Sequence, residues 1–417
     1  MIMKILKSKV FSNSIYLYIL QIFNTIIPLL TLPYITRILG DTQYGIFSKM
    51  LNYVMYFQAV VEYGFNLAGA RKVSLCDNEG ERNKVFSSIV YCRMILFLLS
   101  SSIIAILLWV IAETSTHRLC MLILSMLLIA EVFTQTWFLQ GLQYMKAIML
   151  ISVITRSLST LCIFIFVNDV DDLLLYALLY VVTNLLTAFI GTIIVIKKFN
   201  ARFLKFEMVN IKSSLKDGWP LFTTAFASKI CSGFAITVIG LFCSDAIVGG
   251  YSAVQKIPYI LVMMFAPIGQ TVYPYICKLY ANNKNYGVKI WKILATSILG
   301  ICLSGVVIMI LMRNIIIRII YGADYIQYAN LIIPLACWMF FSITNNLLGI
   351  QVLVARGYQK QYSKCFMLSI FLLIVLNLIM GYLWNAIGVA IATMLGEFVL
   401  AIACLVVIVK NNLLKTS

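Results

Sequence analysis

The sequence predicts an all-α membrane protein with about twelve transmembrane helices, and three observations support this fold class. Of 417 residues, 62% are hydrophobic and only 11% are charged, whereas a soluble domain has roughly 25% charged residues. Apolar runs of about twenty residues, long enough to cross a bilayer as a helix, recur along the whole chain. The connections between these runs carry Lys and Arg unevenly, as those of membrane proteins do.

Twelve apolar windows are expected to span the membrane. The first is expected to be a retained span, because it is longer than a signal-peptide core and contains Pro28 and Pro33. Prolines inside this and a later window are expected to break helices or to act as pivots. The windows lie near 14–36, 44–68, 85–111, 119–140, 147–167, 173–196, 218–242, 247–276, 289–312, 327–352, 361–383 and 387–409.

The longest connection divides the chain in the middle. It is basic and separates the sixth window from the seventh. We therefore expect a six-helix bundle over 1–200, a cytoplasmic linker over 201–217 and a second six-helix bundle over 218–417. A faint similarity between ILGDTQYGIFSK (38–49) and VIGLFCSDAIVGGYSAVQK (238–256) favours two repeats in parallel orientation.

The distribution of cations predicts the orientation. With the N-terminus placed in the cytoplasm, the cytoplasmic segments hold 23 Lys and Arg residues. The opposite side holds four, namely Arg37, Arg118, Arg313 and Arg318. Since Lys and Arg accumulate in cytoplasmic loops, both termini are predicted to be cytoplasmic.

Eight charged residues inside the apolar windows remain once the cations assigned to the connections are set aside. Each costs roughly 2.5–3.5 kcal/mol at a span centre, so a function or a partner is expected for it. The surplus of positive charge favours a phosphate or pyrophosphate ligand over a cationic drug. Snorkelling to the membrane surface, or a buried ion pair with Glu131 or Glu397, is the other possibility for the cations. The residues are Lys49, Arg93, Arg156, Lys229 and Lys256, with Glu62, Glu131 and Glu397.

Other chemistry has little support in the sequence. Eleven scattered cysteines include no CxxC pair, and His117 is the only histidine, so neither a metal site nor a cofactor is expected. The acidic run DVDD (169–172) resembles a metal-binding DxD, but acids are ordinary at a helix start. No basic stretch is interleaved with stacking aromatic residues outside the spans, which argues against nucleic-acid binding.

Several stretches resemble the O-antigen (lipid-linked oligosaccharide) flippases of the Wzx type. These belong to the multidrug/oligosaccharidyl-lipid/polysaccharide exporter superfamily, and the resemblance covers nearly the whole chain. Gln143 departs from the family, which more often has Glu after QGL. The stretches are TLPYITRILGDTQYGIFS (31–48), EYGFNLAGARKVS (62–74), TWFLQGLQYMKAIMLISVITR (136–156), LKDGWPLFTTAFAS (215–228) and GGYSAVQKIPYILVMMFAPIGQTVYPYI (249–276).

The resemblance implies a V-shaped fold of two bundles around a partly cationic lumen. It also implies movement of an undecaprenyl-pyrophosphate-linked sugar repeat across the bacterial inner membrane by alternating access, without any bond being changed. Related lipid II flippases have functional cations at places similar to Lys49 and Lys256. Membrane lipids, and an O-antigen polymerase and chain-length regulator, are the further partners to expect.

On this reading Arg156, Lys256, Lys229, Lys49 and Arg93 would bind the pyrophosphate. The acids Glu397, Glu131 and Glu62 would be the candidates for proton or ion coupling. Two alternatives stay open at this point. One is a multidrug/cation antiporter of the same fold, and the other is an O-antigen polymerase or membrane glycosyltransferase.

Overall fold

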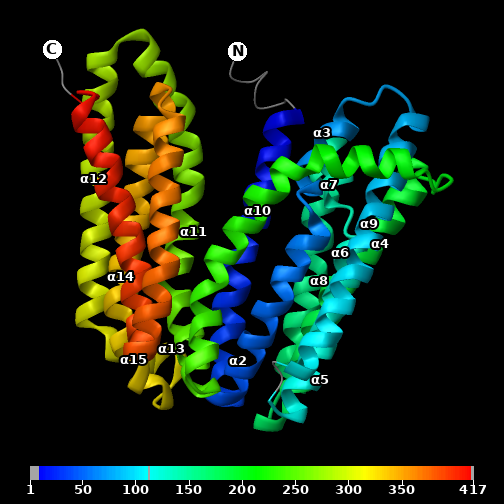
Figure 1. Cartoon of the computed structure of the whole chain (residues 1–417), viewed down its shortest axis with the longest axis horizontal. Coiled ribbons are helices and arrows are strands. Elements are labelled where there is room, and N and C mark those ends of the chain that lie inside the picture. Colours follow the sequence, from blue (N-terminus) through cyan, green and yellow to red (C-terminus); the bar gives the residue numbers. More distant parts are fainter. Residues whose placement is uncertain (1–8, 111–112, 415–417) are drawn as a thin grey trace. The chain divides into compact units, whose positions relative to one another are not determined.

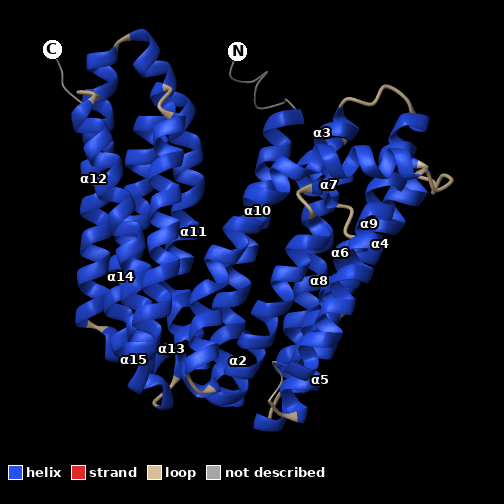
Figure 2. Ribbon diagram, viewed as in Figure 1, coloured by secondary structure: helices blue, strands red, loops and turns tan. Residues whose placement is uncertain are grey.

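The computed structural model describes residues 9–110 and 113–414, and these form helices joined by short connections (Figure 2). The helices in chain order are α2 (Lys9–Glu62), α3 (Phe65–Ser74), α4 (Glu79–Val110), α5 (Ser115–Ser125), α6 (Leu127–Phe133), α7 (Thr136–Gly141), α8 (Met145–Phe166), η1 (Val170–Asp172), α9 (Leu173–Phe199), α10 (Met208–Phe242), α11 (Asp245–Asn282), α12 (Lys284–Leu311), α13 (Arg313–Tyr321), η2 (Asp324–Leu331), α14 (Ile332–Asn345), η3 (Asn346–Leu353), η4 (Val354–Arg356) and α15 (Gln359–Lys410).

Ten helical stretches of the described chain are long and apolar enough to cross a membrane. Two of them are each a pair of helices. The 54 residues of α2 and the 52 of α15 would measure about 80 Å as straight helices, more than twice a bilayer core. Non-helical backbone divides α2 at Gly40, where φ is 71°, and α15 at Trp384 and Asn385. The predicted all-α fold with about twelve spans is thus confirmed.

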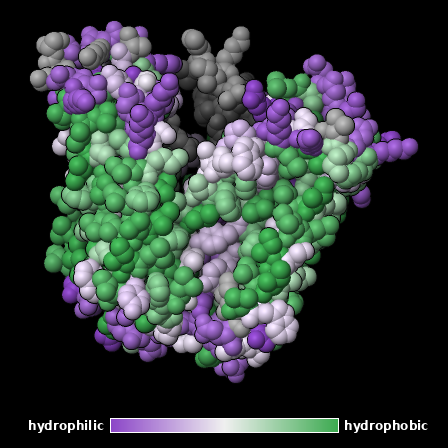
Figure 3. Space-filling view, viewed as in Figure 1, coloured by the Kyte–Doolittle hydropathy of each residue, from purple (hydrophilic) through white to green (hydrophobic). Residues whose placement is uncertain are grey.

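The outer surfaces of the helices are apolar. Leu98, Ile106 and Ile301 are 63%, 65% and 74% exposed, values unusual for such side chains in a soluble protein. Figure 3 shows hydrophobic residues over the middle of the helices and hydrophilic ones at their ends. This surface fits a chain whose helices face lipid, and the protein is a multi-pass membrane protein.

The chain forms two compact units, Met1–Gly233 and Phe234–Ser417. The division falls inside α10, so residues 201–217, expected to link the two bundles, pack with the first unit. The assignment of six spans to each half, with a linker over 201–217, stays a prediction.

Within each unit the cation-rich connections lie at one end. In the first unit, Figure 1 places α5, which carries Arg118, at the end opposite α3, which carries Arg71 and Lys72. In the second unit, α13 with its two arginines lies at the end opposite the last turn of α15, which carries Lys410. This segregation agrees with the uneven charge in the sequence, and the cytoplasmic location of both termini stays a prediction.

Three of the stretches that carry the family resemblance pack together through glycines around α3. Gly64 has a φ of 69°, and a Cβ added there would come within 2.8 Å of the Leu221 Cβ. A Cβ on Gly69 would come within 2.5 Å of the Trp137 ring. Glycine permits both the left-handed backbone and the close approach. The turn after α2, helix α7 and the start of α10 are thereby held against one another.

The spans are interrupted at places that differ from the expected ones. Helix α11 continues through Pro258, Pro267 and Pro274, so these prolines do not end it. The fourth span instead breaks between α6 and α7, where Thr134 has an extended backbone. The tenth span changes to a π-helix over η3. Such irregular backbone is tolerated at membrane depth when protein groups bind its freed polar atoms.

Candidate functional site

Arg93 closes the break in the fourth span. Its side chain projects from α4 and is fully buried. Guanidinium Nη1 donates to the carbonyls of Glu131 and Thr134 at 2.9 and 2.8 Å. Nη2 donates to Asn66 Oδ1 at 3.1 Å and lies 3.7 Å from Glu131 Oε1. A cation at the C-terminal end of a helix is favoured by the helix dipole, and this one also binds carbonyls that the break leaves open.

Two threonines bind further carbonyls at the same break. The Thr134 hydroxyl donates to the Ala130 carbonyl at 2.7 Å. From α9, the Thr192 hydroxyl donates to the Phe133 carbonyl at 2.6 Å. Donors from α4, from α9 and from the broken span itself therefore bind the carbonyls at this interruption.

Two more charged residues surround the Arg93–Glu131 pair. Glu62, at the end of α2, interacts electrostatically with both members of the pair. Lys229 of α10 interacts electrostatically with Glu131. Both side chains are part-buried. Arg93 and Glu131 are an ion pair, and Glu62 and Lys229 are charged neighbours that add one acid and one cation; we call these four residues the Arg93 cluster.

Arg156 has a different environment within the same unit. It lies in the middle of α8 and is part-buried. Its Nη1 donates to Asn24 Oδ1 of α2 at 2.6 Å, and it interacts electrostatically with Tyr180 of α9. Among the described residues no carboxylate forms an ion pair with it. Arg156 therefore keeps an unneutralised charge at mid-span.

Lys49 is held by an acid outside the apolar windows. Its ammonium lies 3.0 Å from Glu113 Oε1, and the lysine side chain is 3% exposed whereas that of Glu113 is 68% exposed. Tyr44, Phe47, Tyr176 and Tyr180 form an aromatic group on the neighbouring surfaces of α2 and α9. In the structure, Lys49 is a buried member of an ion pair.

The second unit contains Lys256 and Glu397. Lys256, on α11, is exposed and its ammonium lies 5.9 Å from the centre of the Tyr259 ring. Glu397, on α15, accepts a hydrogen bond from Asn345 Nδ2 at 2.6 Å. Asn345 is the last residue of α14 before the π-helix begins. In this unit too, an acid, Glu397, lies beside the start of an irregular span.

The expected site residues are consequently divided. The first unit holds Lys49, Arg93, Arg156 and Lys229 with Glu62 and Glu131, and the second holds Lys256 and Glu397. Only Arg93, Glu131, Glu62 and Lys229 form one cluster. The search for charged residues missed their neutral hydrogen-bond partners Asn24, Asn66 and Asn345. An Asn inside an apolar run is the sequence signal that could have identified them.

The acidic run at 169–172 caps a helix. Asp172 accepts hydrogen bonds from the backbone N–H groups of Asn168 and Asp169 at 2.8 and 2.9 Å, which is a capping-box arrangement. Among the described residues no group of three or more His, Cys, Asp or Glu side chains could hold a metal ion.

Solved structures share this fold. The chain superposes on the lipid II flippase MurJ, in an inward closed conformation, with a TM-score of 0.73 and 16% identity, over 95% of this chain and 87% of that one. It superposes on an inward-facing MATE-family multidrug resistance transporter of the MOP superfamily with a TM-score of 0.59 and 15% identity, over 93% of this chain and 97% of that one. The predicted MATE-like fold is thereby confirmed.

Two relatives match over nearly their whole length. A protein of Escherichia coli (strain K12) named "Putative O-antigen transporter" is 27% identical over 96% of both chains. A protein of the same name from Shigella dysenteriae is 24% identical over 94% of this chain and 98% of its own. The family model described as "Polysaccharide biosynthesis protein" matches residues 10–280. With this match on top of the shared fold, the chain belongs to the polysaccharide biosynthesis protein family.

Proposed function

We propose that the protein is a flippase that moves an undecaprenyl-pyrophosphate-linked O-antigen repeat unit from the cytoplasmic to the periplasmic leaflet of the bacterial inner membrane. Its family, the names of its two relatives and its likeness to a lipid II flippase support this proposal. The cargo combines a lipid tail, which stays in the bilayer, with a diphosphate and a glycan that cannot cross apolar lipid unaided. No covalent bond needs to change.

Arg156 is the observation that carries the choice of an anionic cargo. The hydrogen-bond partner of this mid-span guanidinium is a neutral amide. Arg156 can therefore donate hydrogen bonds to a phosphate oxygen without first losing a carboxylate. Charge-assisted hydrogen bonds from Arg to phosphate are strong and have a fixed geometry. We assign Arg156 the leading role in holding the pyrophosphate.

The other cations take different roles in this proposal. Lys256 is exposed and Lys229 is part-buried, so both can add a point charge to the diphosphate. Lys49 would have to leave Glu113 before it could do so. Arg93 donates to two carbonyls of the broken span and to Asn66 of α3, and we infer that it positions that span instead of touching the cargo.

Transport would proceed by alternating access, in which the two halves rock and expose the site to one leaflet and then to the other. Glu131 and Glu397 each sit beside an irregular span, and together with Glu62 they are the candidates for proton or ion coupling. Replacing the coupling acid with Gln should abolish proton-driven transport while cargo binding is retained. Unchanged transport in all three Gln variants would reject coupling by these acids.

A leaflet-resolved assay of the lipid-linked unit tests the proposal. In Arg156→Ala we expect the unit to accumulate in the cytoplasmic leaflet, and Arg156→Lys should retain part of the transport because it keeps the charge. Full transport in Arg156→Ala would overturn the role of this residue.

Deleting the gene separates a flippase from an O-antigen polymerase. Loss of a flippase leaves complete lipid-linked units on the cytoplasmic face. Loss of a polymerase lets single units reach the cell surface. Single units at the surface of the deletion strain would overturn the proposed function.

A further inference from the structure

The segment 201–207, which we call the strap, is fixed along α4 by its backbone. Asn83 and Ser87 accept hydrogen bonds from the N–H groups of Arg202 and Leu204 at 3.1 and 2.8 Å. The hydroxyls of Ser87 and Tyr91 donate to the carbonyls of the same two strap residues at 3.1 and 2.8 Å. Because positions 83, 87 and 91 are four apart, they form one face of α4. The strap therefore has a defined conformation although it is not helical.

This conformation leaves apolar side chains open to the outside. Phe203 and Phe206 are 45% and 53% exposed, and Met208 at the start of α10 is 62% exposed. The cations Arg202 and Lys205 alternate with them and are exposed as well. Aromatic and basic side chains mixed in this way are typical of segments that lie in the membrane interface.

The neighbouring helices place the strap at the level of the membrane surface. It follows Lys197 and Lys198 in the last turn of α9 and precedes Lys212 and Lys216, which are exposed on α10. Figure 1 shows the first part of α10 lying across the ends of the helices of its unit, at the same end as α3. Figure 3 shows hydrophilic residues at the ends of the helices, on either side of the apolar band.

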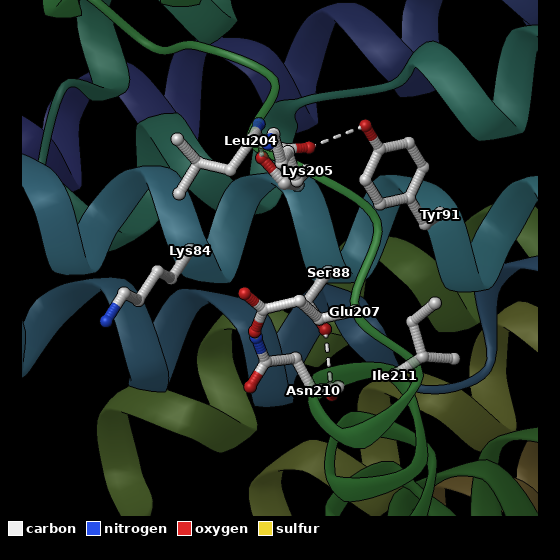
Figure 4. A pocket seen from close by; sticks show the side chains of 9 residues that line it. Lys84, Ser88, Tyr91, Leu204, Lys205, Glu207, Asn210 and Ile211 are labelled. Atoms are coloured by element: carbon white, nitrogen blue, oxygen red, sulfur yellow. Dashed lines mark hydrogen bonds between the residues drawn. The ribbon is translucent and has the colours of Figure 1, made fainter.

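A groove runs between the strap, α4 and the start of α10 (Figure 4). Its space of about 340 Å³ includes open solvent, so the groove is accessible from outside. Lys84 and Lys205 line it together with polar groups of Ser87 and Ser88. Glu207 also lines it, and its carboxylate accepts a hydrogen bond from Asn210 at 2.6 Å.

We propose that the strap and its groove bind an anionic phospholipid of the leaflet that this end of the unit faces, with the phosphate between Lys84 and Lys205 and the acyl chains against Phe203 and Phe206. Two lysines beside one carboxylate leave a single positive charge, which matches a monoanionic phospholipid headgroup better than a pyrophosphate. The site thus serves the surrounding bilayer and is separate from the cargo site at Arg156.

Native mass spectrometry of the full-length protein tests the headgroup half of the proposal. Phosphatidylglycerol and phosphatidylcholine with the same acyl chains are added in parallel. We expect Lys84→Gln with Lys205→Gln to weaken phosphatidylglycerol binding by about fivefold per cation removed. The matched control, Lys289→Gln with Lys292→Gln, removes two exposed lysines of the second unit and should change binding less than twofold.

Equal binding of the two lipids, or an equal loss in both double variants, would overturn the proposal. Displacement of phosphatidylglycerol by equimolar undecaprenyl pyrophosphate, together with loss of flipping in the strap variant, would assign the groove to the cargo instead and also overturn it. Melting curves of all variants establish that each one is folded.

Photo-crosslinking tests the apolar half. Benzoylphenylalanine placed at position 206, in protein reconstituted in nanodiscs, should crosslink to phospholipid. The same residue placed at position 86, where Phe86 is fully buried, should crosslink only to protein. Crosslinks from position 206 to protein alone would show that the strap faces its own chain and would overturn the proposal.

Discussion

Arg93 and Arg156 are two arginines inside apolar spans of the same unit, and their surroundings differ completely. Arg93 is fully buried, and its donors are directed at two carbonyls, an amide and a carboxylate. Arg156 is part-buried and donates to one amide oxygen. The two residues have the same chemistry and a similar depth in the sequence pattern.

The comparison shows that one intramembrane cation can be neutralised by its own fold while another keeps its charge, which under the proposed function is available to the cargo. A buried charge costs several kcal/mol unless partners surround it, and Arg93 has those partners. Arg156 has no carboxylate partner among the described residues, so its charge costs free energy that an anionic ligand could offset. The number of hydrogen-bond and ion-pair partners therefore distinguishes Arg93 from Arg156, which the sequence alone does not.

The largest expected effect comes from removing Arg93. Arg93→Leu should lower the free energy of unfolding by about 3–5 kcal/mol, because the buried carboxylate of Glu131 loses its ion-pair partner and two carbonyls of the broken span lose their donor. Melting of the detergent-solubilised protein, followed by loss of the monodisperse peak, measures this. Adding Glu131→Leu should restore part of the stability. An Arg93→Leu protein that melts normally but does not transport would instead place Arg93 at the cargo.

A large effect on transport, with little effect on stability, is expected at Arg156. Removal of a charge-assisted hydrogen bond worth about 1.5–3 kcal/mol should slow transport by about 10- to 100-fold in Arg156→Ala. The melting midpoint should stay close to that of the wild type, since no carboxylate is stranded. If Arg156→Ala unfolded the protein, Arg156 would have a stabilising role like that of Arg93, and the comparison would fail.

Thr192 tests whether the broken span is stabilised as a unit. Thr192→Val removes the hydrogen bond to the Phe133 carbonyl and should cost about 1 kcal/mol of unfolding free energy. Thr183→Val is the matched control, because the Thr183 hydroxyl donates only within its own helix, to Leu179. Equal melting of the two variants would argue against a role for Thr192 at the break.

The smallest effect is expected from the partner of Arg156. Asn24→Ala should reduce transport about threefold, because the guanidinium loses one orienting hydrogen bond of about 0.5–1.5 kcal/mol while its charge remains. Asn184→Ala serves as control, since Asn184 donates to Tyr180 in its own helix. A loss as large as that of Arg156→Ala would mean that Asn24 itself contacts the cargo.

The sequence predicted the spans well and the interruptions poorly. The window 289–312 corresponds to α12, and the doubled helices at 14–68 and 361–409 were resolved correctly. The window 119–140 was predicted as one continuous span through Thr134, because hydropathy averaged over a window does not report backbone geometry. The residue that closes this break, Arg93, lies some forty positions earlier in the chain, so no local pattern could reveal it.

The assignment of the site residues stays a prediction, and the partners of these residues could not be read from the sequence for the same reason. Charge within an apolar run identified Arg93, Arg156 and Lys49 as exceptional. It did not distinguish them, because the distinction rests on Asn66, Asn24 and Glu113, which come from other segments. Glu113 lies between the predicted spans 85–111 and 119–140, so it was not considered among the charged residues inside the spans.

The glycine contacts around α3 have a consequence for how such proteins diversify. Gly64 and Gly69 let neighbouring segments touch directly, and neither belongs to the Arg156 site. This part of the family resemblance therefore reflects the packing of the helices and carries no information about a glycan. Retargeting the transporter to a new polymer should leave this junction untouched, and two chains that share it can be expected to serve quite different cell surfaces.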